Sequence, residues 1–362
     1  MKKSNLIVKF YYENESKEGF VKYHILEKRN LDLFIKNLSK KMKVVAPCKK
    51  EEKNYVFAEI SSADEISENY IPTILPPKKY FMPQREKIIE FSMDGNISAP
   101  CEKEKLAIFG VRTCDLSGIQ CLNIVFNEKP VDCNFLMRKE NIFIIGIECN
   151  KYCDEYASCA LVNSYLPNGG YDLFFTDIGE KYVINVNTQE GEDIIEAMKL
   201  PSALSNDMIA LDKVREEKKK IFKNEINIDP SKIPQILEKA YNSKIWDEIG
   251  NKCVSCGNCT NVCPTCYCFD MDDKINLDLK TGERIRTWDS CQFETFAKVA
   301  GGENFREERA LRQRHRVYRK FKFPVDKYNR FFCTGCGRCS RTCMAGINLK
   351  EILIKVAEEV KF

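Results

Sequence analysis

Two uninterrupted apolar segments, residues 106–112 and 142–148, stand out in the hydrophobic pattern of the middle of the chain. Continuous apolar runs of this length are typical of strands that are buried on both faces of a sheet. Between them, residues 116–126 predict a helix that begins after Asp115, so the three segments form a βαβ unit. Its two strands should be parallel in one sheet, although not necessarily adjacent. The pattern therefore predicts an α/β fold with a partly parallel sheet.

Weaker patterns extend this layer on both sides. Residues 31–42 predict a helix capped by Asn30, with four apolar side chains on one face: Leu31, Phe34, Ile35 and Leu38. The four prolines of residues 71–83 favour extended or turning chain over helix. Paired strands are expected at 7–12 and 22–26, further strands near 44 and at 55–60, a hairpin at 171–176 and 182–187, and helices at 191–199 and 206–223.

The segment 224–234 is polar, contains two prolines and precedes a shift towards cysteine and arginine. A chain of 362 residues has room for two or three domains. We therefore predict an α/β domain at 1–224 and a mainly α-helical domain at 225–362. In the second domain we expect a hairpin at 274–288 that turns at Thr281-Gly282, a helix at 305–322 capped by Asn304, and an amphipathic helix at 349–360.

The second domain contains two cysteine runs with the spacing C-x2-C-x2-C-x3-C, and the first run ends in Pro264. This is the pattern that holds [4Fe–4S] clusters in bacterial ferredoxins, where the fourth cysteine of each run binds the other cluster. Crossed ligation predicts one cluster on Cys253, Cys256, Cys259 and Cys343, and a second on Cys333, Cys336, Cys339 and Cys263. Zinc sites usually pair two C-x2-C hooks, so zinc is disfavoured. The runs predict a two-cluster, ferredoxin-like electron-transfer domain.

Four further cysteines follow the two buried strands: Cys114, Cys149, Cys153 and Cys159. Open α/β sheets bind ligands at the carboxyl ends of their strands, so these thiols could hold a third metal centre, a third [4Fe–4S] cluster. Buried cysteines that act as small apolar residues are the alternative, and the residues leave both open. We expect Cys48, Cys101, Cys121 and Cys133 to be structural. For Cys266, Cys268 and Cys291, packing beside the first cluster is favoured over tuning it.

Nineteen cysteines would indicate disulfides in a small secreted protein. The first ten residues, however, hold an apolar run that is too short for a signal peptide and is broken by Lys9. The longest apolar runs, such as 142–147, are far below membrane-spanning length. We therefore expect a cytoplasmic, reducing and anaerobic setting without a membrane span. A net charge of +4 among 57 basic and 53 acidic residues gives no indication of nucleic acid as a partner.

No arrangement of residues predicts bond-making chemistry. The chain has two histidines, and His315 fits packing or hydrogen bonding better than metal ligation. No glycine-rich stretch has the G-x-G-x-x-G pattern after a strand, so we expect no flavin or nucleotide bound by this chain alone. The predicted helix at 305–322 carries eight Arg or Lys against two Glu, too many for one exposed stripe. Some of these cations should point inward, towards the clusters, or meet carboxylates of a partner.

Six motifs resemble one family: residues 75–85 (LPPKKYFMPQR), 110–115 (GVRTCD), 263–269 (CPTCYCF), 288–293 (WDSCQF), 300–306 (AGGENFR) and 314–316 (RHR). It is the iron–sulfur dicluster family that includes the iron–sulfur subunit of anaerobic sulfite reductase and the sulfhydrogenase beta subunits. The likeness spans about residues 70 to 350. It departs from the family pattern at Thr113, at Met344 and after Cys159, where a second nearby cysteine is missing.

The resemblance implies a non-catalytic subunit that passes electrons from a flavin-containing subunit, which oxidises NAD(P)H, to a large catalytic subunit with sirohaem or a NiFe centre. Two other functions stay open. In one, the cysteines at the strand ends form a catalytic centre that reduces a substrate, and turnover of a small disulfide or sulfite by the isolated chain would support it. In the other, the chain is a scaffold whose metal is only structural, as a redox-silent protein would indicate.

Overall fold

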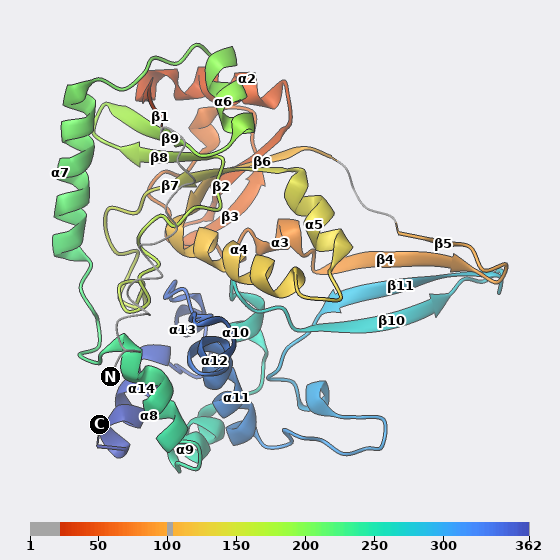
Figure 1. The fold of residues 1–362 in the computed structure, drawn as a ribbon. Helices are drawn as coiled ribbons and strands as arrows, with labels where there is room; N and C mark the ends of the chain where they lie inside the picture. Colours follow the sequence, from red (N-terminus) through yellow and green to blue (C-terminus); the bar gives the residue numbers. More distant parts are fainter. Residues whose placement is uncertain (1–21, 100–103, 362) are drawn as a thin grey trace.

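The computed structural model describes residues 22–99 and 104–361. Its N-terminal part is built on a seven-stranded sheet with the order β1-β9-β8-β7-β6-β2-β3 (Figure 1). These strands are β1 (Lys22–Glu27), β2 (Lys43–Glu51), β3 (Asn54–Glu59), β6 (Leu106–Arg112), β7 (Ile142–Ile147), β8 (Leu173–Asp177) and β9 (Lys181–Val186). Strand β1 was predicted to pair with residues 7–12, which lie outside the described residues; it pairs with β9.

The centre of the sheet is parallel, as the two apolar runs predict. Strand β6 pairs in parallel with β7 on one side and with β2 on the other, and β7 pairs in parallel with β8. The outer strands β1, β3 and β9 are antiparallel to their neighbours. The crossover from β6 to β7 contains the predicted helix and also a second one, α5, that the sequence analysis did not anticipate. The predicted α/β class with a partly parallel sheet is confirmed.

Helices cover both faces of this sheet (Figure 1). One face packs against α2 (Leu31–Ser39) and α6 (Gln189–Ala197). The opposite face packs against α3 (Lys78–Phe81), α4 (Thr113–Phe126) and α5 (Cys133–Glu140). The four predicted face residues of α2 are all buried. Because α3 is a helical turn, the expectation that residues 71–83 contain no helix was wrong: Pro76 and Pro77 precede the turn, where proline is tolerated.

A second, four-stranded sheet joins segments that lie almost 200 residues apart. Its order is β10-β11-β4-β5, and it forms the arm that projects from the body in Figure 1. The strands are β4 (Arg85–Ser92), β5 (Ile97–Ser98), β10 (Phe269–Ile275) and β11 (Thr281–Trp288). The predicted turn at Thr281-Gly282 was misplaced, because both residues belong to β11. Asp278 makes the turn instead, since its carboxylate accepts hydrogen bonds from the amides of Lys280 and Thr281.

The rest of the C-terminal part is rich in helices around a separate apolar core. These helices are α8 (Ile233–Lys239), α9 (Ile245–Lys252), α10 (Asn258–Asn261), α11 (Arg309–Phe321), α12 (Phe323–Tyr328), α13 (Arg338–Arg341) and α14 (Leu349–Glu359). Helix α7 (Ser205–Ile221), which precedes them, packs against β1 and β9 of the N-terminal sheet. Helix α11 begins later than predicted, after Glu308 rather than Asn304. Among the described residues no helix is long and apolar enough to cross a membrane. The domain division at residue 224 stays a prediction.

Candidate iron–sulfur site

The two cysteine runs fold in the same way. Gly257 and Gly337 occupy the left-handed region with φ of +72° in both, and each is followed by a one-turn helix, α10 or α13. Glycine adopts this backbone without the steric cost that other residues carry. In each run, the amide two residues after the first cysteine donates to that cysteine's Sγ, at 3.4 Å for both Cys253 and Cys333. The matched spacing in the sequence therefore produces two matched backbone cradles.

The end of the first run lies among the cysteines of the second. One cavity is lined by Cys259 and Cys263 of the first run together with Cys333, Cys336 and Cys339 of the second. Burial raises the pKa of Cys333, and the negative charges of Cys339, Cys336 and Cys263 also contribute. Four thiolates gathered in one place repel one another unless cations compensate their charge, as the iron of a cluster does. The donor set and the cavity fit a [4Fe–4S] cluster.

The first run is less enclosed. Cys253 is buried, Cys259 lies close enough to interact with it electrostatically, and Cys256 is exposed. The crossing partner, Cys343, packs against the same apolar core as Cys253. The two runs are tied together where the Asn258 side chain donates to the carbonyl of Thr342 at 2.8 Å. A cluster on this run would be the nearer of the two to the surface.

Within the described residues, no three Cys, His, Asp or Glu side chains are close enough together to hold a single metal ion. A tetrahedral zinc ion needs every sulfur at about 2.3 Å. An iron–sulfur core instead fills the space between its thiolates, so its ligands stay further apart.

Helix α11 supplies polar groups to both runs. Gln313 Nε2 donates to Cys253 Sγ at 2.9 Å. Arg316 is buried; burial opposes its charge, but the neighbouring thiolates of Cys259 and Cys339 raise its pKa above the ordinary value. Burial likewise opposes the charge of Lys320, whose pKa is raised by Cys263 and Cys266. The prediction that cations of this helix point inward is confirmed for Arg316 and Lys320, and Arg312 is buried as well.

A buried ion pair connects the second run to the N-terminal sheet. Arg338, in α13, forms a two-pronged pair with Asp115 at the start of α4, at 2.6 and 2.8 Å. Its Nε also donates to the carbonyl of Thr73 at 2.8 Å. Arg338 is 1% exposed and Asp115 is fully buried. This pair places the start of α4, with Cys114, directly beside the second run.

The cysteines at the strand ends lie partly together. Cys149 accepts hydrogen bonds from Arg112 at 3.6 Å and Thr113 at 3.7 Å. Burial raises the pKa of Cys153 to about 11, and the charge of Cys149 adds to the effect. Burial also raises the pKa of Cys159, where Cys149 and Cys153 contribute in turn. These three thiols are therefore neighbours. Cys114 interacts with Cys149 and also with Cys336 of the second run.

The loop that carries Cys153 and Cys159 packs onto the second run. The Ser158 amide donates to the Gly335 carbonyl at 2.7 Å. A Cβ at Gly335 would lie 2.3 Å from the Ser158 backbone, and a Cβ at Gly337 would lie 2.8 Å from that of Tyr156. Side chains at these two glycines would therefore push the loop away. The strand-end cysteines form a group directly beside the second run.

Sequence reasoning missed several supporting residues, because their roles depend on contacts between distant segments. Lys78 is buried, lies 4.0 Å from the Trp288 ring centroid and donates to the Cys266 carbonyl at 2.9 Å. Burial lowers its pKa to about 8. The motifs at 75–85, 263–269 and 288–293 thus meet in space. Their joint presence in the sequence was the one indication that Lys78 has a supporting role. Gln313 carried no comparable signal.

The remaining cysteines divide into two classes. Cys121 is buried, Cys48 is half-buried and Cys133 is exposed, and Cys101 lies outside the described residues. A second cavity, separate from that of the second run, is lined by three further cysteines: Cys266, Cys268 and Cys291. These three surround a space, which the predicted packing role did not anticipate.

Comparison with known proteins agrees with this geometry. A family model described as a 4Fe-4S dicluster domain matches residues 252–347. The chain is 34% identical to the sulfhydrogenase 2 subunit beta of Pyrococcus furiosus over 327 residues, which cover 90% of this chain and 95% of that protein. The chain belongs to the family of iron–sulfur electron-transfer subunits that includes the sulfhydrogenase beta subunits, and it carries 4Fe-4S clusters.

Proposed function

We propose that the chain relays electrons through two [4Fe–4S] clusters, from a flavin-containing subunit that oxidises NAD(P)H to a catalytic subunit. The observation that carries this proposal is the cavity in which Cys263 of the first run meets three cysteines of the second. With crossed ligation, each run would contribute ligands to both clusters, so the two clusters would lie close together. Electron transfer needs such proximity.

A bound [4Fe–4S] cluster supplies a centre that takes up and releases electrons. The chain's own residues set the surroundings of that centre. Gln313 and the backbone amides donate hydrogen bonds to the ligand sulfurs and thereby favour the more negative, reduced state. Arg316 and Lys320 add buried positive charge from α11. The cysteines of the second run are half-buried, whereas the exposed Cys256 brings the first run to the surface.

We assign different partners to the two ends of the relay. The catalytic partner we propose is a large subunit of the hydrogenase type, because the relative is named a sulfhydrogenase subunit. A sirohaem partner, which the sequence left equally open, has no comparable support. The flavin-containing partner follows from the family resemblance, and we place its contact near Cys256 because the first run is the more exposed.

We further propose a third [4Fe–4S] cluster on Cys114, Cys149, Cys153 and Cys159. Three of these thiols interact with one another, and Cys114 interacts with both Cys149 and Cys336. A cluster here would lie beside the second one, because the loop that carries Cys153 and Cys159 packs on the backbone of Gly335. It would extend the relay into the N-terminal part of the chain.

The test is anaerobic mixing of the intact chain with NAD(P)H and its flavin-containing subunit. We expect the iron–sulfur absorbance to bleach only when NAD(P)H is present together with the flavin subunit, and to recover when an electron acceptor is added with the catalytic subunit. The variant Cys133→Ser, at an exposed cysteine outside all proposed sites, should bleach and recover as the wild type does. Equally fast electron exchange between the two partners without this chain would contradict the proposal.

A further inference from the structure

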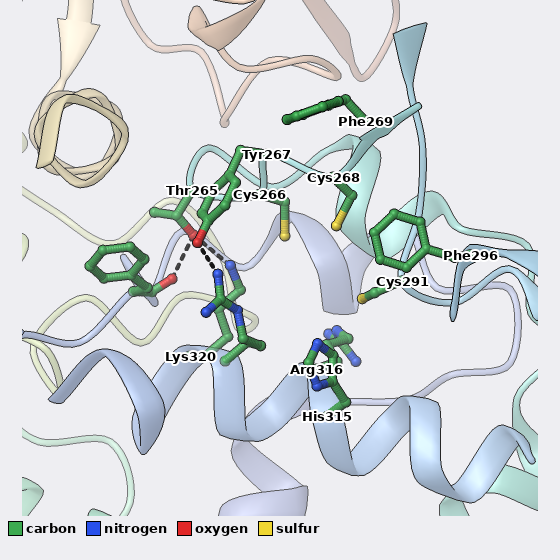
Figure 2. A pocket seen from close by; sticks show the side chains of 12 residues that line it. Thr265, Cys266, Tyr267, Cys268, Phe269, Cys291, Phe296, His315, Arg316 and Lys320 are labelled. Atoms are coloured by element: carbon green, nitrogen blue, oxygen red, sulfur yellow. Dashed lines mark hydrogen bonds between the residues drawn. The ribbon is translucent and has the colours of Figure 1, made fainter. Parts of the chain in front are cut away.

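A cavity of about 340 Å³ lies between the segment after the first run and α11. Its volume is within the range of sites that bind small molecules or cofactors. Figure 2 shows the sulfur atoms of Cys266, Cys268 and Cys291 around one space, with His315 and Arg316 of α11 on the opposite side. Three thiols and an imidazole therefore converge from three separate segments.

Two of the three thiols are in contact with each other, and the three do not fill the space. Cys268 and Cys291 form a hydrogen bond, which raises the pKa of Cys291 well above the ordinary value, with burial as the second cause. Cys266 lies close enough to feel the charge of Cys291. Cysteines that serve only as packing fill a core, whereas these three line a void. Their arrangement suits thiols that bind a metal core in the space between them.

The opposite wall provides a nitrogen donor and positive charge. His315 is half-buried and lines the cavity, and a neutral imidazole can donate an electron pair to a metal. Arg316, Arg319 and Lys320 also line the cavity, and no carboxylate is among its described lining residues. Such a wall favours an occupant with net negative charge, as a thiolate-bound metal core has.

We propose that Cys266, Cys268, Cys291 and His315 bind a [2Fe–2S] cluster, in addition to the clusters of the two runs and the strand-end group. The contacting pair, Cys268 and Cys291, would share one iron, and Cys266 and His315 would bind the other. Mixed cysteine and histidine ligation is an established mode for [2Fe–2S] centres. A single zinc ion fits less well, because these side chains are not gathered closely enough around one point.

This site would lie next to the cluster of the second run. Cys266 forms a hydrogen bond with Cys263, one of the proposed ligands of that cluster. Phe269, on the rim of the cavity, is exposed. The cluster would thus form a further point between the buried relay and the surface. The proposal concerns metal binding by this chain, so it stands or falls independently of which partner subunits deliver or accept electrons.

The first test compares iron content after anaerobic purification of the intact chain. The variant Cys268→Ser/Cys291→Ser should lose two irons and two inorganic sulfides per chain, while the EPR signals of the [4Fe–4S] clusters remain. Cys48→Ser and Cys133→Ser, outside the cavity, should lose none. An unchanged iron content in the double variant would overturn the proposal. If the double variant loses all iron, the second test decides.

The second test uses the wild-type protein. The chain has only two histidines, His24 and His315, and the Nδ1 of His24 is hydrogen-bonded to the Leu200 carbonyl at the far edge of the N-terminal sheet. Pulsed EPR of the reduced protein, prepared with ¹⁵N-histidine, should therefore detect a coupling of directly bound imidazole that comes from His315. His315→Cys should keep the iron but lose this coupling. Absence of the coupling in the wild type would reject the histidine-ligated cluster.

Discussion

At the residue scale, the most specific feature is the position of Cys263. It belongs to the first run by sequence, yet it shares a cavity with three cysteines of the second run. In bacterial ferredoxins the fourth cysteine of each run binds the other cluster, and this is the crossed ligation that we propose here. The two fourth cysteines, Cys263 and Cys343, therefore provide the sharpest test of the assignment.

We expect Cys263→Ser to alter the same EPR signal as Cys336→Ser, because both residues are proposed ligands of the second cluster. Cys343→Ser should instead alter the same signal as Cys256→Ser. The comparison needs EPR spectra of the four reduced variants beside the wild type. If each fourth-cysteine variant matches a variant of its own run, ligation is not crossed.

The strand-end group predicts a loss of iron that is independent of both runs. Replacing Cys153 by Ser removes one of four proposed ligands, so the chain should lose about four irons, the content of one cube. Iron analysis of the anaerobic protein measures this loss, and Cys133→Ser serves as the control. An iron content equal to that of the wild type would show that these cysteines only pack.

The eight cysteines of the two runs could be proposed from spacing alone, because the ligand pattern is local in the sequence. Gln313 could not, because its role depends on α11 folding back onto Cys253. The three thiols of the second cavity were noted in the sequence, but their spacing did not show that they surround a space. What the sequence hides at this scale is contact between distant segments.

At the element scale, α11 lies between the cysteine runs and the C-terminal apolar core. Its Gln313 donates to a proposed ligand sulfur, and a hydrogen bond to sulfur stabilises the reduced cluster. Removing a bond worth about 1 kcal/mol corresponds to about 40 mV for a one-electron couple.

Gln313→Leu should therefore lower the reduction potential of the first cluster by about 40 mV. A redox titration followed by EPR measures the potential of each cluster separately. Gln84→Leu is the matched control, since Gln84 is exposed and lies before β4. An unchanged potential in the Gln313 variant would mean that this hydrogen bond does not favour the reduced cluster.

The pairing of β4 with β11 is the second feature at this scale, and its buried ion pairs explain why it holds. Glu86 of β4 pairs with Arg286 of β11 and with Arg138 of α5, and its side chain is 2% exposed. Arg286 also pairs with Asp132. Removing one partner from a buried pair leaves an uncompensated charge. Glu86 thus joins the arm to α5, one of the helices that cover the N-terminal sheet.

Glu86→Gln should lower the free energy of unfolding by about 3–5 kcal/mol. Urea unfolding of the anaerobic protein, followed by circular dichroism, measures the change. Glu90→Gln on the same strand is the control: Glu90 is exposed and pairs with Lys87 on the surface, so its replacement should have little effect. Equal destabilisation by both variants would contradict the role given to Glu86.

Element prediction succeeded for the parallel strands and α2, and it failed at one local turn and at one pairing between distant strands. The parallel strands and the face of α2 followed directly from hydrophobic spacing. The hairpin turn was misplaced, because Thr281-Gly282 resembles a turn whereas Asp278 provides the stabilising carboxylate. The pairing of β4 with β11 had no local signature, because it joins strands from distant parts of the chain.

At the scale of the whole molecule, the N-terminal sheet and the second cysteine run are in direct contact. The pair Arg338–Asp115 and the loop beside Gly335 place the strand-end cysteines against the second run. Exposed Cys256 lies on the other run. The proposed order of centres thus leads from the surface, through the first and second clusters, to the strand-end group.

The central claim is that this chain carries at least two [4Fe–4S] clusters close enough to exchange electrons. The most direct measurement is EPR of the fully reduced, anaerobically purified chain, with spin quantitation and metal analysis of the same sample. We expect at least two spins per chain, with lines broadened by magnetic coupling between neighbouring clusters, and at least eight irons, from four per cube. A chain that contains zinc in place of iron and gives no EPR signal on reduction would contradict the account.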